Sequence, residues 1–394
     1  MSVDRYTWAV TADGVPVGRV ADGGTIRRGR PDVTTQARAG YARLARVALE
    51  PTDRPLPLRA LVTITCTPPA GSAVTVFVGR VTDTAETVTR AGRLATVRSL
   101  DLTATGPLGQ AARSGPPAGG YPAQTDGARV RAALGQALIR SWEQLPGTWA
   151  DLDGTWATID PAYDESLLPD GLLLLAADPD PPDPYRSARD AAVSGGGLVY
   201  ETADGRVGYQ PADARGGALL TPTVLPAPLA AGVQARSSTD EHANRVEVEW
   251  TGGTAAAVDA AAQLRDGAVL VQTIDTTLVD GVDADERAAQ ALRYATRPRP
   301  TVAMTWPLHL LTPAASAQLL ALALGDYVQM PALPIDTDRA GFIEQVELNV
   351  DRRQPALTLT VSPPSASLLY LPWTQLPGTW DAQTPNTWDD YATT

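Results

Sequence analysis

The chain has 394 residues, of which 44% are apolar and 19% charged, and its formal net charge at pH 7 is −12. This composition is typical of a folded protein with several domains and excludes a disordered chain. All 32 basic residues are arginine, which excludes a Walker A loop, a Schiff-base lysine and an S-x-x-K nucleophile.

The first segment, residues 1–108, is predicted to consist mostly of strands. Short runs rich in threonine and valine, partly alternating and separated by turn residues, are typical of strands. These runs are TIRRG, ALVTITCT, AVTVFVGRV and LATVRSLDLTATG. The run from Arg38 to Glu50 has the alanine, leucine and arginine content of a helix. Its position between strands favours a strand, and we predict a small antiparallel barrel or sandwich.

The second segment, residues 109–235, is predicted to be an α+β insertion that opens in the linker SGPPAGGYPAQTDG. A helix is expected from Asp126, its N-cap, because five apolar residues share one face. These are Val130, Ala133, Leu134, Ala137 and Leu138. A short helix, SARDAAVSGG, should end at its glycines, and Asp204-Gly205 should form the turn of a hairpin.

The third segment, residues 236–364, is predicted to be a second barrel with helical insertions. ANRVEVEW alternates cleanly, and AVLVQTID and TVAMTWPLHLL are further expected strands. A helix capped by Asp283 and another stopped by Gly325 are expected between the strands. GFIEQVELNVD and PALTLTVSPP should form the final strand pair. Residues 365–394 show no helical or strand period and are predicted to be an extended Trp-rich arm.

The motif W-x-Q-L-P-G-T-W occurs twice, within residues 141–156 and 372–388, and the two copies hold six of the nine tryptophans. The central Pro-Gly indicates a turn, and so short a segment cannot bury three indoles in a core of its own. The arms could clamp onto the protein's own barrels, dock on a neighbouring subunit or another protein, or bind carbohydrate. The predicted docking residues are Trp142, Leu145, Trp149, Trp156, Trp373, Leu376, Trp380 and Trp388.

Candidate catalytic and metal-binding residues are few, and we predict no enzyme activity, cofactor or metal. Cys66 alternates with Val62 and Ile64 and is expected to be buried on a strand. His242 and His309 lie 67 residues apart without an H-x-H or H-E-x-x-H motif, which argues against a metallopeptidase. A two-carboxylate glycosidase, with Tyr163–Ser166 as a candidate site, stays open as an alternative.

Charge is distributed unevenly along the chain. Residues 1–115 carry 15 Arg against 9 acids (+6), residues 116–185 carry 3 against 11 (−8), and the remainder 14 against 24 (−10). This is either ordinary solvated surface or complementary contact between neighbouring subunits or stacked rings. No basic stripe indicates tight nucleic-acid binding. No signal peptide or membrane span is expected, so the protein should be soluble and made in a cytoplasm.

Two groups of motifs resemble a known family. GGTIRRGRPDVTTQARAGYARLARVALE and FVGRVTDTAET resemble the opening barrel of phage tail hub proteins. HANRVEVEW, LALGDYVQM and GFIEQVELNVDRRQPALTLTVSP resemble the second barrel of the same proteins. The match spans most of residues 1–364, and its specificity lies in the order and spacing of the motifs. The chain resembles a baseplate hub or minor tail protein of an actinobacterial siphophage, related also to the N-terminal part of tail-associated proteins.

The resemblance implies two tube-like β-barrels, residues 1–108 and 236–364, that flank the α+β domain. Three subunits would present six barrels, close the tail tube as a ring, adapt its sixfold symmetry to a threefold tip and form part of the DNA exit channel. Implied partners are the distal tail protein or tail tube above, the tape measure protein's C-terminus, and tip or fibre proteins below. DNA would pass without specific binding, and no membrane insertion is implied. The protein would reside in the virion tail tip after synthesis in the host cytoplasm. The alternatives are a distal tail connector and a carbohydrate-binding tail-tip protein.

Overall fold

The structure is a computed structural model of the whole chain. It describes residues 6–20, 23–30, 36–49, 56–69, 71–91, 95–115, 120–138, 167–169, 173–215, 221–238, 241–296, 300–333 and 340–363. The molecule is mainly β with a few helices, as predicted, and its strands form one large sheet and three small ones. None of the described helices is long and apolar enough to span a lipid bilayer.

Seven strands come from the first segment of the chain. They are β1 (Thr7–Ala12), β2 (Val15–Val20), β3 (Gly24–Gly29), β4 (Arg38–Leu49), β5 (Leu61–Thr67), β6 (Val74–Ala91) and β7 (Ala95–Thr105). All their pairings are antiparallel. The ladders run β4–β2–β1–β5–β6–β7, and β7 pairs again with β4. The prediction that Arg38–Glu50 forms a strand is confirmed for Arg38–Leu49, because pairing with β3 and β7 outweighs its helix propensity.

A second group of strands comes from the C-terminal part of the chain. It comprises β12 (Thr223–Val224), β13 (Gly232–Arg236), β17 (Thr301–Pro307), β18 (Tyr327–Gln329), β19 (Ala340–Asn349) and β20 (Ala356–Ser362). The predicted final pair is confirmed as β19 and β20, which run antiparallel. β19 also pairs with β3 from Gln345↔Gly29 to Asn349↔Thr25. This one ladder joins both groups into a 13-stranded sheet with a shared apolar core.

A second core gathers helices and short strands. From the middle of the chain come α1 (Pro107–Ala111), β8 (Gln124–Thr125), α2 (Asp126–Ala137), β9 (Leu174–Leu175), α4 (Pro184–Gly195), β10 (Leu198–Glu201) and β11 (Val207–Gln210). From further on come β14 (Arg245–Trp250), β15 (Gly253–Val258), α5 (Ala260–Asp266), β16 (Val271–Asp275) and α6 (Gly281–Ala295). Val246 and Val248 of β14 pack in this core together with α2 and α4. The division of the chain into four domains stays a prediction.

Several local expectations meet different outcomes. Gly196 adopts φ +70° and ends α4, and Asp204-Gly205 forms the β10–β11 turn, both as predicted. The N-cap of α2 is Thr125, not Asp126, because Asp126 uses its carboxylate on Leu173 N–H and Tyr209 O–H.

Two more helix boundaries differ from prediction. Asp280, not Asp283, caps α6 and accepts from Val282 N–H. The helix predicted to stop at Gly325 is α7 (Pro313–Leu320) and ends five residues earlier.

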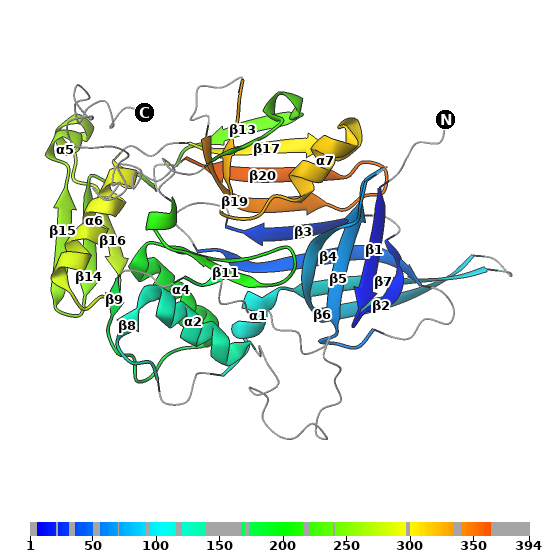
Figure 1. Cartoon of the computed structure of the whole chain (residues 1–394), viewed down its shortest axis with the longest axis horizontal. Coiled ribbons are helices and arrows are strands. Elements are labelled where there is room, and N and C mark those ends of the chain that lie inside the picture. Colours follow the sequence, from blue (N-terminus) through cyan, green and yellow to red (C-terminus); the bar gives the residue numbers. More distant parts are fainter. Residues whose placement is uncertain are drawn as a thin grey trace.

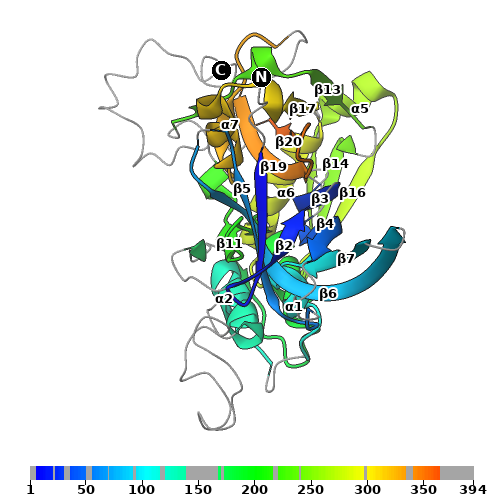
Figure 2. The same ribbon diagram turned by 90° about the vertical axis from the view of Figure 1, so that its right-hand side faces the viewer.

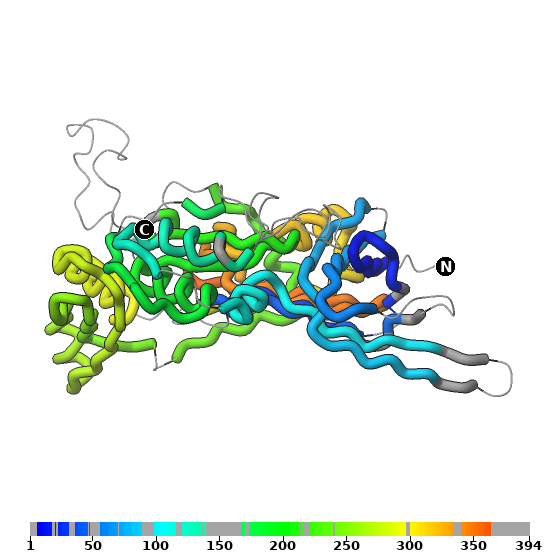
Figure 3. The backbone as a smooth tube through the Cα atoms, turned by 90° about the horizontal axis from the view of Figure 1, so that it is seen from below, coloured from blue at the N-terminus to red at the C-terminus, as the bar shows by residue number. Residues whose placement is uncertain are grey.

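The elements form an elongated molecule. The β14–β16 sheet, α5 and α6 lie at one end, and β1, β2 and β5 lie at the other (Figure 1). Viewed from the second end, β6 and β7 sweep out to one side (Figure 2). The same two strands reach past the body as a long hairpin (Figure 3), paired as far as Ala91↔Ala95.

Candidate functional site

A buried carboxylate, Glu344 on β19, holds two parts of the chain to the large sheet. Arg30, next to β3, donates from Nε to Glu344 Oε2 at 2.7 Å. Arg215, in the short 3-10 helix Asp213–Arg215, donates to Oε1, as does the Ser362 hydroxyl. Burial alone would raise the pKa of Glu344, but the charges of Arg215 and Arg30 outweigh it and bring the pKa to about 2. Glu344 is therefore a charged tie at the centre of the fold.

A second buried carboxylate, Glu201, ends β10. It accepts hydrogen bonds from Gly40 N–H on β4 at 2.8 Å and from Leu108 N–H on α1 at 2.7 Å. Burial raises its pKa to about 7, although both backbone bonds and the charge of Arg28 oppose the shift. Glu201 therefore ties the β10–β11 hairpin to the large sheet and to the first turn of α1.

A cleft of about 400 Å³ separates the Glu344 cluster from the β14–β16 sheet. Arg30, Arg215 and Glu344 line it from one side. Residues 272–275 of β16 and the α6 residues Arg287 and Tyr294 line it from the other. Two buried polar atoms here, the Tyr294 hydroxyl and Arg215 Nε, have no hydrogen-bond partner within the described part of the chain. A buried donor without an acceptor is costly, so this cleft fits an occupant that supplies oxygen acceptors.

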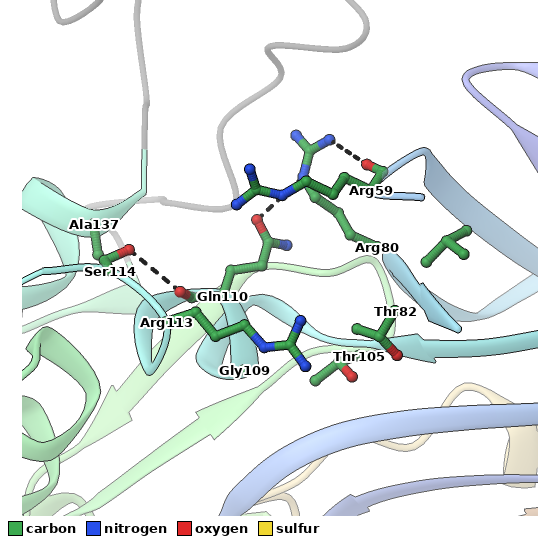
Figure 4. Close-up of a pocket in the computed structure, with 10 residues that line it drawn as sticks. Arg59, Arg80, Thr82, Thr105, Gly109, Gln110, Arg113, Ser114 and Ala137 are labelled. Atoms are coloured by element: carbon green, nitrogen blue, oxygen red, sulfur yellow. Dashed lines mark hydrogen bonds between the residues drawn. The ribbon is translucent and has the colours of Figure 1, made fainter. Parts of the chain in front are cut away.

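A second hollow, of about 340 Å³, lies between β6 and α1 and is lined by Arg59, Arg80 and Arg113 (Figure 4). Arg80 donates from Nε to Gln110 Oε1 at 3.1 Å and from its guanidinium to Arg59 O at 3.0 Å. Burial lowers the pKa of Arg80, the charge of Asp13 opposes this, and Arg59 adds to it. No carboxylate lines the hollow. It is a basic site on the part of the chain that carries the positive charge.

The eight predicted docking residues all lie outside the described residues, so the structure brings none of them together. The other three tryptophans are described. Trp8 and Trp306 are buried in the core of the large sheet and donate to Asp351 O and Pro226 O, each at 3.0 Å. Trp250 packs half-buried against the second core. The tryptophans outside the repeats thus serve the cores.

The candidate catalytic residues show no catalytic arrangement. Cys66 is buried, as predicted, and burial raises the pKa of its thiol to about 12. His242 contacts Asp266 Oδ2 at 2.8 Å and Ala295 O at 3.0 Å, as expected for a histidine with a structural role. His309 lies in the 3-10 turn Leu308–Leu310 rather than in a strand, since β17 ends at Pro307. Within the described ranges, no cluster of three His, Cys, Asp or Glu could hold a metal. Tyr163–Ser166 lies outside them.

Sequence reasoning missed Glu201 and Glu344. A signal for Glu344 was present, because it stands alone within the run GFIEQV, whose residues are buried on both faces of β19. A charged residue inside such a strand needs a buried partner. Its partners Arg30 and Arg215 are 314 and 129 residues away in sequence, so no local pattern could identify them.

Comparisons with solved structures show which fold this is. The prophage MuSo2 43 kDa tail protein from Shewanella oneidensis has a TM-score of 0.59 at 11% identity, covering 92% of this chain and 99% of that one. The tail protein from Neisseria meningitidis MC58 has a TM-score of 0.60 at 13% identity, covering 92% and 98%.

A third similar structure is the E. coli c3393 protein, a component of the type VI secretion system with structural similarity to the T4 tail proteins gp27 and gp5. Its TM-score is 0.50 at 13% identity, over 93% of this chain and 80% of that one. The sequence matches no protein-family model and no curated protein. The expected resemblance to phage tail proteins is therefore confirmed for the fold.

Proposed function

We propose that the protein is a structural virion component, the hub of a phage tail tip or baseplate, without catalytic activity. The observation that carries this proposal is the fold, which matches that of two phage tail proteins over almost their whole length. Three copies close the tail tube as a ring, adapt its sixfold symmetry to a threefold tip, and line part of the DNA exit channel.

The two groups of strands are the tube-like barrels of this hub. The cycle of ladders from β4 through β2, β1, β5, β6 and β7 back to β4 supports the first barrel. The second group, β12, β13 and β17–β20, stands beside it, joined by the β3–β19 ladder. Two joined β units in one chain supply six units in a trimer, which suits a sixfold tube. Ring closure also covers strand edges that would otherwise stay open.

Charge supports contact between unlike surfaces of neighbouring copies. Residues 1–115 carry a net +6 and include Arg59, Arg80 and Arg113 of the basic hollow, whereas the rest of the chain is acidic. A contact between unlike surfaces repeats around an axis and closes into a ring when the rotation allows it. The tryptophan repeats add aromatic anchors that dock on a neighbouring subunit, tail tube or tip protein.

The experiment is to image the purified protein and to measure its mass by light scattering at two concentrations. A trimeric ring with an open lumen and a pseudo-sixfold outline is expected. A particle that remains monomeric alone and after mixing with the distal tail and tip proteins of its own phage would refute the hub. Incubation with peptidoglycan tests the structural role separately, because lysis would identify an enzyme.

A further inference from the structure

The cleft beside Glu344 borders one edge of the β14–β16 sheet. The sheet order is β15–β14–β16, and β16 pairs with β14 alone among the described strands. Four consecutive β16 residues, 272–275, line the cleft. Successive side chains of a strand point to opposite faces, so a cleft that all four residues line follows the strand's edge. Backbone N–H and C=O groups on such an edge are available to another strand.

The opposite wall of the cleft is the end of β20. Ser362 and Pro363 line it, and Pro363 is the last residue before the C-terminal arm. The arm therefore starts inside this cleft, opposite the open edge of β16. Two residues of extended chain span roughly 7 Å, so Ser365 is already within reach of the strand.

The first part of the arm has the sequence of a short strand. Residues 365–371 read SASLLYL, lie between Pro364 and Pro372, and contain no charge. Four apolar residues in a row, Leu368 to Leu371, are costly to leave in water. The two prolines cannot donate hydrogen bonds to a ladder, so they limit any added strand to the residues between them.

We propose that residues 365–371 add to the open edge of β16 in the same chain and form a fourth strand of this sheet. The segment fills the cleft and brings backbone carbonyl groups into it. These are the acceptors that the Tyr294 hydroxyl and Arg215 Nε lack. Main-chain pairing gives the affinity, as in other cases of strand addition, and the apolar side chains cover the sheet.

This docking is independent of the proposed assembly, because both partners belong to one chain. It also gives the second tryptophan repeat a fixed base. Trp373 follows Pro372 directly, so the repeat leaves the molecule from the cleft and extends toward whatever lies beside it.

The test is a cysteine scan across residues 365–371, one position at a time, combined with Thr273→Cys on β16. Thr273 is exposed, and the native Cys66 is buried and unreactive, so only the introduced pair responds to mild oxidation. The matched control is Thr254→Cys on β15, the opposite edge strand, which is also exposed. Elution volume and circular dichroism verify that each variant folds.

The proposal expects disulfide-linked monomers at alternate scan positions, because only one face of an added strand brings its cysteines near Thr273→Cys. Formation should be at least about tenfold faster than with Thr254→Cys, since docking raises the local thiol concentration. Equal rates for the two edges would overturn the proposal, and so would the absence of any cross-link. Dimer-sized products would overturn it as well, because they would place the arm of a second copy in the cleft.

Discussion

Arg30 and Glu344 form a buried ion pair of 2.7 Å that ties the N-terminal β unit to the C-terminal one. Their side chains are 7% and 0% exposed. The backbone repeats the contact, since Arg30 N–H donates to Glu344 O at 2.8 Å. Arg215 reaches the same carboxylate from a third part of the chain. One residue therefore controls how three distant segments meet, and several predictions follow from its surroundings.

Replacing Glu344 by Gln should strongly destabilise the fold. The change leaves Arg30 and Arg215 buried without a counter-charge, which typically costs about 3–5 kcal/mol. Urea unfolding followed by circular dichroism measures the loss. The matched control is Glu347→Gln on the same strand, where the pair with Arg27 is 3.9 Å long and both side chains are over a third exposed. The control should cost less than about 1 kcal/mol, and equal losses would contradict the role of Glu344.

Glu344 should also contribute to acid unfolding. Its pKa is about 2 in the folded protein against 4.5 ordinarily. A lowered pKa means that the contribution is complete above pH 4.5 and is lost as the pH falls toward 2. The difference in free energy of unfolding between wild type and Glu344→Gln should therefore shrink over this window. Denaturant titrations at several pH values test this, and a constant difference would argue against it.

Glu201 should act in the opposite direction. Burial raises its pKa from 4.5 to about 7, so the folded state favours the protonated form. The stability that this adds is complete below pH 4.5 and is lost as the pH rises through 7, a change on the order of 3 kcal/mol. Relative to Glu201→Gln, wild type should lose stability between pH 4.5 and 7. Glu249→Gln, on the exposed face of β14, should leave the profile unchanged.

Gly29→Ala should be poorly tolerated. Gly29 has φ +97°, and an added Cβ would lie 2.1 Å from Glu344 O and 2.9 Å from Gln345 Cα, both backbone atoms. The strand would have to shift at the ladder that joins the two β units. We expect a loss well above the roughly 1 kcal/mol of an ordinary glycine substitution at positive φ. Gly14→Ala is the control, since Gly14 has φ +77° with nothing within 4 Å of the added atom.

Trp380→Ala should weaken assembly without lowering the stability of the monomer. If the second tryptophan repeat docks on a neighbour, loss of one buried indole costs about 2 kcal/mol, or roughly a 30-fold higher dissociation constant. Sedimentation at several concentrations measures the constant, and thermal unfolding of the monomer serves as the reference. Thr379→Ala, the adjacent residue, should have little effect. An unchanged dissociation constant would remove Trp380 from the interface.

The sequence by itself determined the strands and the burial of their alternate residues. Val62, Ile64 and Cys66 are buried as the alternation predicted, because a strand's period of two is written in adjacent residues. Turn positions such as Gly196 and Asp204-Gly205 were equally local. Helix caps were harder to predict, since Asp126 could cap a helix or bond elsewhere, and Tyr209 decided between them.

Only the tertiary structure decided which strands become neighbours. The β3–β19 ladder and the Arg30–Glu344 pair join residues more than 300 positions apart, and no local pattern encodes such a pairing. The same is true of the cleft, which exists because β20 ends opposite the open edge of β16. Short-range periodicity follows from backbone geometry. Long-range contacts follow from the competition of all apolar and charged surfaces for the same interior.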